Sequence, residues 1–186
     1  QDGVTVSHEH GPLYPPQREN YSYGMEMQGP AVSSDRLFFR NPTPGLANSA
    51  GFVDFVSDVV FSQGSGFFEQ SFEVGLQTPT PGAVIRYSRD GSTPTPTTGE
   101  VYTEPVQVAD TTVLRVAAFL DGYEPSYSDT RTYIFIRTED GNGGILNQPG
   151  RPAGFPWTWG DGIQADYEMD QDVVTDPAYS DEIADD

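Results

Sequence analysis

The 186-residue chain contains no cysteine and no lysine, and it has only two histidines. Without cysteine, disulfide bonds and thiolate-based catalysis or metal binding are excluded. The nine basic residues, all arginine, stand against 28 acidic residues and give a net charge of −19. Such a charge repels nucleic acid and anionic membranes, so neither is an expected partner.

Long hydrophobic runs are also missing. No apolar stretch approaches the roughly 20 residues that a membrane-spanning helix needs, which predicts no membrane insertion. Hydrophobic residues make up 35% of the chain, beside 20 glycines and 16 prolines, which indicates a modest core among many turns. The chain opens on "QDGVTV" without a signal peptide. We interpret it as a processed chain or an internal piece of a larger protein.

Composition predicts three segments. Residues 1–48 are broken by Pro, Gly, Asn and Ser, with strand-like runs only at 4–10 and 34–40, and predict an N-terminal arm. Residues 49–137 carry closely spaced strand patterns. Residues 138–186 are rich in Gly and Pro and then acidic, with 12 of the 28 acidic residues and one arginine. They predict a C-terminal connector or arm.

The central segment shows the period of β-strands. Phe72, Val74 and Leu76 share one face of a run, as do Ile85 and Tyr87. Short runs with turns every 8–12 residues, and without helical spacing, predict an all-β fold built as an antiparallel β-sandwich with extended irregular arms on both sides. The runs are 52–61, 66–78, 83–91, 105–110, 111–122 and 129–136.

One stretch of this segment, "IRYSRDGSTPTPTTGEVYTEPV", has the composition of either a functional loop or a corner between strands. It alternates at first, turns at Asp90-Gly91, and continues through a Ser/Thr/Pro run. Glycine tolerates positive φ at such a turn, and aspartate accepts hydrogen bonds from the backbone ahead of it. We therefore predict a structural corner and expect any function to lie in the arms.

Residues 72–135 resemble the chitobiase/β-hexosaminidase C-terminal-like module through "IRYSRDGSTPT", "VYTEPV" and "TTVLRVAAFLDGYEPS". The resemblance implies an immunoglobulin-like β-sandwich from a secreted or cell-surface bacterial protein. "YPPQRENYSYG" and "FFRNPTPGLANSAG" resemble the end of a lamin-tail-like domain. "PAGFPWTWG" and "ADYEMDQDVVTDPAYSDEI" resemble the connector of large secreted bacterial proteins that carry a spore-coat-H-like kinase domain. Together they imply part of a multidomain extracellular protein.

Metal binding has three candidate locations, the His8/His10 pair and two acidic stretches of the last segment. His8 and His10 would share one side of a strand, but two imidazoles without a third ligand favour a plain surface strand. Calcium, which takes oxygen ligands, is the candidate cofactor. The alternative is that the chain binds no cofactor. The stretch from Asp166 to Asp172 lacks the glycine and terminal glutamate of an EF-hand loop, and "EDGNGG" at 139–144 is too short to be diagnostic. Solvated acidic linkers are the alternative. The candidate ligands are Asp140, Asn142, Asp166, Glu168, Asp170 and Asp172.

Catalytic motifs are not found. The chain has no G-x-S-x-G, P-loop or H-E-x-x-H pattern. A Ser/His/Asp triad would need one of two histidines that both lie in the irregular first segment. Paired carboxylates are not evidence of glycoside hydrolysis here, because a chain this acidic always contains such pairs. We predict that the chain is not an enzyme.

Aromatic residues of the last segment are the better functional lead. Phe155, Trp157, Trp159 and Tyr167 either stack on sugar rings or dock onto the sandwich or a neighbour. Docking favours a non-catalytic structural or spacer module whose arms pack on neighbouring domains or subunits of an extracellular assembly, by aromatic burial and strand addition. The alternative is a carbohydrate-binding accessory module with a polysaccharide partner.

Overall fold

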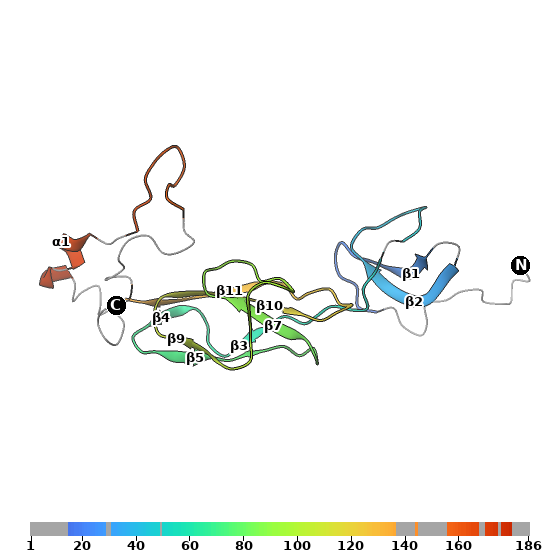
Figure 1. The fold of residues 1–186 in the computed structure, drawn as a ribbon, viewed down its shortest axis with the longest axis horizontal. Helices are drawn as coiled ribbons and strands as arrows, with labels where there is room; N and C mark the ends of the chain where they lie inside the picture. Colours follow the sequence, from blue (N-terminus) through green and yellow to red (C-terminus); the bar gives the residue numbers. More distant parts are fainter. Residues whose placement is uncertain are drawn as a thin grey trace, which may run out of the picture. The chain divides into compact units, whose positions relative to one another are not determined.

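The computed structural model describes residues 15–28, 31–48, 50–136, 144, 156–167, 170–174 and 176–179. The chain divides into two compact units, Gln1–Asp54 and Phe55–Asp186 (Figure 1). Strands dominate the described residues, where the helix α1 spans only Gln171–Val174. No helix in the described part of the chain is long and apolar enough to cross a membrane. The division of the chain into the segments 1–48, 49–137 and 138–186 stays a prediction.

The first unit is built on an antiparallel hairpin. Strand β1 (Ser22–Gln28) pairs with β2 (Ala31–Phe39), and the register shifts between Met25 and Met27. The strand predicted at 34–40 is confirmed within β2. Strand β1 was not predicted, although Tyr23, Met25 and Met27 alternate with polar residues and glycine along "SYGMEMQ". The strand-like run at 4–10 lies outside the described residues.

Phe38 and Phe39 are the buried centre of this unit, with exposed fractions of 4% and 1%. Phe38 and Phe52 exchange two backbone hydrogen bonds of 2.9 Å, and their rings stack at 5.8 Å. The strand predicted for 52–61 is therefore wrong. Its first residue pairs within the first unit, Phe55 makes a separate bridge to Glu124, and only Val60–Phe61 form a strand, β3. The apolar spacing of 52–61 is not that of a continuous strand.

The second unit contains the sandwich. Its larger layer is a five-stranded sheet in the order β4-β11-β10-β7-β8. Facing it are two antiparallel pairs, β3 with β6 and β5 with β9. This all-β, immunoglobulin-like arrangement confirms the predicted fold class, although β4 runs parallel to β11. The strands are β4 Gly66–Phe68, β5 Phe72–Val74, β6 Leu76–Gln77, β7 Val84–Ser88, β8 Glu100–Val101, β9 Val106–Val108, β10 Thr112–Phe119 and β11 Asp129–Phe135.

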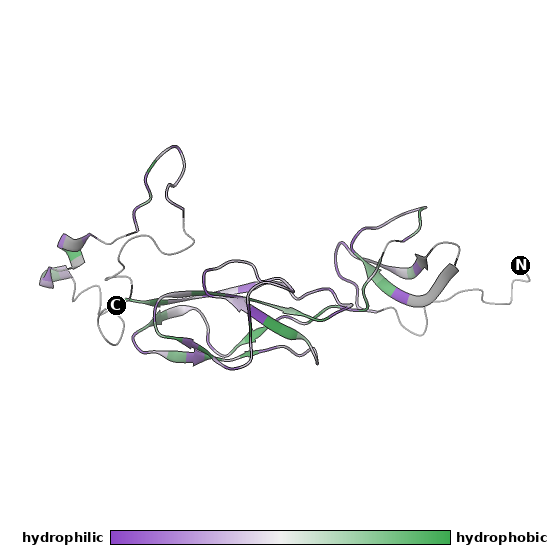
Figure 2. Ribbon diagram, in the orientation of Figure 1, coloured by the Kyte–Doolittle hydropathy of each residue, from purple (hydrophilic) through white to green (hydrophobic). Residues whose placement is uncertain are grey.

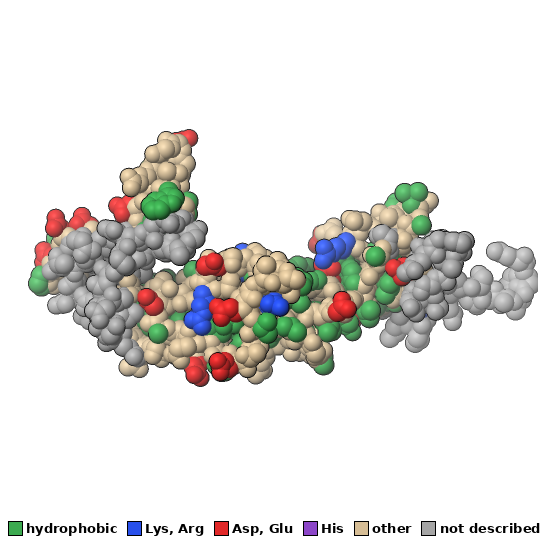
Figure 3. All heavy atoms as spheres, viewed as in Figure 1, with side chains coloured by type: hydrophobic (Ala, Val, Ile, Leu, Met, Phe, Trp, Pro, Cys, Tyr) green, Lys and Arg blue, Asp and Glu red, His purple; other side chains and the backbone are tan. Residues whose placement is uncertain are grey.

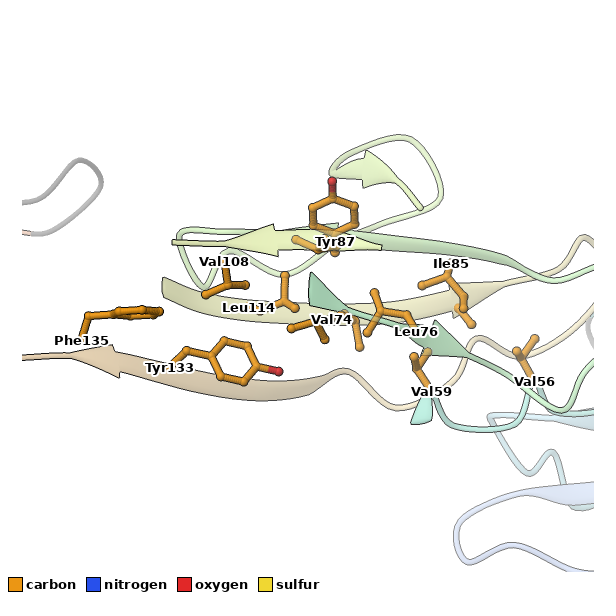
Figure 4. Close-up of a cluster of buried hydrophobic side chains, with 13 residues drawn as sticks. Val56, Val59, Val74, Leu76, Ile85, Tyr87, Val108, Leu114, Tyr133 and Phe135 are labelled. Carbon is orange, nitrogen blue, oxygen red and sulfur yellow. The ribbon is translucent and has the colours of Figure 1, made fainter. Parts of the chain in front are cut away.

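The core lies between these two layers. Figure 4 shows side chains from both layers converging there, and Figure 2 shows hydrophobic and hydrophilic positions following one another along the strands. The predicted faces are confirmed, since Val74, Leu76, Ile85 and Tyr87 are all buried. Each large apolar side chain buried in this way stabilises the fold by about 1.5–3 kcal/mol.

One end of the core is aromatic. Phe68, Phe72, Tyr133 and Phe135 pack together with ring centroids 4.3 to 6.1 Å apart. The Tyr133 hydroxyl donates to the Gln63 carbonyl at 3.0 Å, and burial raises the pKa of Tyr133. Edge-to-face and offset contacts of this kind add to the stabilisation from area alone.

The Ser/Thr/Pro stretch is a structural corner, as predicted. Asp90 Oδ1 accepts hydrogen bonds from the Ser92 hydroxyl (2.6 Å) and N–H (3.0 Å), which lower the pKa of Asp90. The following residues fold back along the outer face of β7 and β10, where Arg115 donates to the Gly91 carbonyl at 3.4 Å. Pro94 is buried beneath the corner, and Ala117 on that outer face is only 3% exposed. The corner therefore supplies cover for the sheet.

Gly99 closes this corner in a conformation that suits glycine. Its φ is +86°, and a Cβ atom there would lie 2.9 Å from the Tyr87 carbonyl oxygen and 3.3 Å from Pro94 Cβ. Any side chain at this position would strain the backbone and also collide with it.

Candidate functional site

Residues 156–167 form a small hairpin. The Ala165 N–H donates to the Trp157 carbonyl at 2.9 Å and the Trp159 N–H to the Ile163 carbonyl at 3.0 Å, on either side of the Thr158–Gln164 pair. The hairpin turns at Asp161 and Gly162, whose φ angles of +48° and +75° indicate a type I′ turn. The interpretation of this stretch as irregular chain is wrong. An Asp-Gly pair after alternating tryptophans was the signal that would have predicted the hairpin.

This register gathers the aromatic residues on one face. Side chains alternate along a strand, so Trp157 and Trp159, with Ile163 across from them, lie on the face opposite to Thr158 and Gln164. Trp157 is 70% exposed, Trp159 60% and Ile163 61%. Figure 3 shows hydrophobic side chains gathered on this part of the chain. We call Trp157, Trp159, Ile163 and Tyr167 the aromatic face.

Tyr167 fixes one side of the aromatic face. Its hydroxyl donates to the Pro156 carbonyl at 2.9 Å, and its ring meets Trp159 edge to face with centroids 5.9 Å apart. Three of the four predicted aromatic residues are thus brought into one hairpin, while Phe155 lies outside the described residues. The result is an exposed, largely apolar surface, which suits either a protein surface or the C–H face of a sugar ring.

The predicted calcium ligands are not brought into one cluster among the described residues. No group of three or more metal-ligating side chains occurs in that part of the chain. Asp170 instead accepts a hydrogen bond from the Asp172 N–H at 2.9 Å, as a residue at the start of a helix does. Asp140, Asn142 and Glu168 lie outside the described residues, as do His8 and His10. Calcium binding stays a prediction.

Several polar groups of the sandwich serve its structure. Ser126 accepts a hydrogen bond from the Ala118 N–H at 2.8 Å, and Ser88 donates to the Ser92 carbonyl at 2.6 Å. The Tyr87 hydroxyl donates to Glu100 at 3.0 Å, and its pKa is raised by burial and by this hydrogen bond. These contacts tie strands and corners together, which is what a scaffold requires.

Sequence reasoning missed a groove on the outer face of the sandwich. It has a volume of about 350 Å³, and its lining comes from β7, the end of β10, the turn that follows β10, and the Ser/Thr/Pro corner. No local pattern predicts it, because these segments come together only in the folded sheet. Its lining residues are Val84, Arg86, Pro96, Phe119, Leu120, Asp121, Gly122, Tyr123 and Pro125.

Comparison with known families identifies one part of the chain. Residues 63–131 match the family model of the chitobiase/beta-hexosaminidase C-terminal domain. The match confirms the predicted resemblance of the central segment and covers most of the sandwich. A C-terminal domain of a glycosidase-like family fits a non-catalytic accessory module. Neither the comparison with curated proteins nor the comparison with solved structures found a match.

Proposed function

We propose that this chain is a non-catalytic accessory module of a secreted or cell-surface bacterial protein, in which the sandwich is a rigid spacer and the aromatic face packs on a neighbouring copy in an extracellular assembly. The observation that carries the proposal is the exposure of Trp157 and Trp159, at 70% and 60% on one hairpin face. Rings of this size bury 150–250 Å² each in packed sites, so their exposure marks a contact surface.

The flanking segments fit the same proposal. Residues 1–48 would be the end of a lamin-tail-like domain, and residues 138–186 a connector toward a further domain such as a spore-coat-H-like kinase. Both would place the sandwich between other parts of a longer extracellular protein. A spacer needs internal rigidity, and the fully buried core between the two sheet layers supplies it.

The net charge of −19 gives this proposal a specific salt dependence. Copies of so acidic a chain repel one another at low ionic strength, and salt screens that repulsion over about 10 Å at 0.1 M. An association held by apolar contact should therefore strengthen as sodium chloride is added. Sedimentation velocity of the whole chain over a range of concentrations, at low and high salt, measures this directly.

The decisive variant is Trp157→Ala/Trp159→Ala, with Phe67→Ala as the matched control. Phe67 is 69% exposed but lies on the sandwich. We expect the double variant to stay monomeric at concentrations where the wild type and Phe67→Ala associate. A wild-type chain that is monomeric at every concentration and salt level would overturn the proposed assembly.

Carbohydrate binding is the second candidate, because the same exposed rings suit stacking on a sugar. Stacking on a neutral polysaccharide changes little with salt, unlike association between two acidic chains. Pull-down on insoluble cellulose, xylan and chitin tests it, with retention expected for the wild type and loss for Trp157→Ala/Trp159→Ala. Equal retention of both proteins, or of neither, would rule out this candidate.

A further inference from the structure

The groove on the outer face of the sandwich has an apolar floor and two walls that are held in place by hydrogen bonds and packing. Phe119 and Val84 are register partners on neighbouring strands β10 and β7, on the face opposite to the buried Ala118 and Ile85. Val84 is 45% exposed and Phe119 is partly exposed. One aromatic ring and one aliphatic side chain are therefore open to solvent side by side.

The wall formed by Pro96 belongs to a tight turn. The backbones of Thr95 and Thr98 exchange hydrogen bonds of 3.3 Å, and their hydroxyls lie 2.7 Å apart. Pro96 occupies the second position of this turn, where its fixed φ is favourable. Pro94, just before the turn, is buried, and Arg86 on β7 donates to the Gly99 carbonyl just after it at 2.9 Å. This wall is consequently preformed.

The opposite wall is anchored in the core. The Tyr123 N–H donates to the Leu120 carbonyl at 3.1 Å across a turn in which Gly122 has φ +76°. Leu120 and Tyr123 also pack against the buried cluster. Asp121, at the tip of this turn, is exposed and lines the groove. A carboxylate acceptor is thus held at the rim of the groove.

Arg86 supplies hydrogen-bond donors from the floor. One of its nitrogens, Nη1, donates to the Gly99 carbonyl at 2.9 Å, and among the described residues it has no carboxylate partner. A guanidinium carries five N–H donors, so most of them stay available to a ligand. Arg86 and Asp121 balance each other in formal charge. The lining therefore combines an aromatic face, a set of donors and an acceptor with no net charge.

We infer that this groove binds one or two rings of a neutral saccharide. A sugar presents an apolar C–H face to Phe119 and Val84, with hydroxyls that accept from Arg86 and donate to Asp121. The volume of about 350 Å³ is near the lower end of the range for small-molecule sites, about 300–1,000 Å³, which suits a short saccharide. An anionic sugar is disfavoured by the net charge of −19.

A larger depression, of about 550 Å³, is lined by a single short stretch of chain, Gln63 and residues 67–72. Its amides, Glu69 and phenyl rings could also meet a sugar, so the variant Phe67→Ala serves to separate binding there from binding in the groove. The groove beside the Ser/Thr/Pro corner is distinct from the aromatic face of residues 156–167. Its saccharide binding therefore does not depend on the proposed assembly.

Titration of the isotopically labelled whole chain with soluble neutral tetrasaccharides of glucose, xylose, mannose and N-acetylglucosamine tests the inference by NMR. We expect saturable shifts confined to β7, residues 119–125 and the corner. Phe119→Leu, which keeps an apolar side chain but removes the ring, and Asp121→Asn, at an exposed position, should each weaken binding about tenfold, as expected for the loss of about 1.4 kcal/mol.

Two controls make the result decisive. Phe67→Ala removes an exposed ring elsewhere on the same sheet, and Trp157→Ala/Trp159→Ala removes the aromatic face; both should bind as the wild type does. The inference is overturned if no neutral tetrasaccharide binds, if Phe119→Leu binds with wild-type affinity, or if trigalacturonic acid binds more tightly than every neutral sugar. Loss of binding only in the tryptophan variant would assign the sugar to the aromatic face instead.

Discussion

The sandwich and the hairpin of residues 156–167 use aromatic side chains in opposite ways. Tyr133 and Phe135 are fully buried between the two layers, whereas Trp157 and Trp159 are more than half exposed. In the sandwich the rings hold β-strands from distant parts of the chain together. In the hairpin they form an outward face on a two-stranded frame that is too small to bury them. Burial, rather than residue type, separates aromatic residues that stabilise the fold from those that we propose to serve a contact.

The largest expected effect comes from removing a buried ring. Phe135→Ala should destabilise the sandwich by about 3–5 kcal/mol, because both the transfer energy and the packing around the cavity are lost. Chemical denaturation followed by circular dichroism measures this change. A loss below about 1 kcal/mol would mean that the aromatic end of the core is loosely packed, since such a small cost is typical of exposed sites.

Glycines at positive φ offer a matched pair across the two regions. Gly99→Ala in the corner should destabilise the protein by about 2–3 kcal/mol, since its Cβ would meet the Tyr87 carbonyl oxygen at 2.9 Å in addition to the backbone strain. Gly160→Ala in the hairpin has φ +94° but no atom within 4 Å, so about 1 kcal/mol of local strain is expected. Equal losses would show that crowding at Gly99 is relieved by movement of the corner. Thermal unfolding compares the two variants.

Two tyrosine hydroxyls allow a smaller comparison. Tyr87→Phe loses a partly buried hydrogen bond to Glu100 and should reduce the free energy of unfolding by about 1 kcal/mol. Tyr167→Phe loses an exposed hydrogen bond to the Pro156 carbonyl, with an expected effect below about 0.5 kcal/mol. Denaturant titrations of both variants measure the difference. The reverse order would contradict the view that the hairpin contributes little to stability.

The smallest expected effect depends on pH. Hydrogen bonds from Ser92 hold the pKa of Asp90 below its ordinary value of 3.8. The stabilisation from this carboxylate is therefore present above that value and is lost as the pH falls through the folded-state pKa. Asp90 is largely exposed, so solvent screening keeps the effect small.

Asp90→Asn should remove this share of the acid sensitivity. Thermal unfolding between pH 2 and pH 6 should show a slightly smaller loss of stability on acidification for Asp90→Asn than for the wild type. Parallel curves for the two proteins would show that the corner is stabilised by contacts other than the Asp90 carboxylate.

Local patterns in the sequence predicted much of the sandwich. Alternation at Ile85 and Tyr87, and again along Thr112–Phe119, identified core-facing strands because side-chain direction has a period of two residues in any strand. The Asp90-Gly91 turn was also predictable, because the turn depends on the chemistry of these two neighbouring residues alone.

Strand neighbours and composite surfaces were not predictable in this way. The parallel pairing of Tyr133 with Gly66 joins residues far apart in the chain, and no local pattern specifies it. Phe52 was assigned to the wrong element because its partner, Phe38, lies in a separate hairpin. The groove lined by Arg86, Phe119 and Asp121 exists only where three segments meet. Three residues of the aromatic face, Trp157, Trp159 and Tyr167, were predicted from the sequence, but neither Ile163 nor the hairpin that aligns them was predicted.

The most direct test of the proposed contact role measures stability and association together in Trp157→Ala/Trp159→Ala. We expect a free energy of unfolding within about 0.5 kcal/mol of the wild-type value, as for surface substitutions, and loss of the salt-promoted association that we predict for the wild type in sedimentation. A double variant that unfolds several kcal/mol more easily, or that still associates as the wild type does, would contradict the claim that these rings serve a contact rather than the fold.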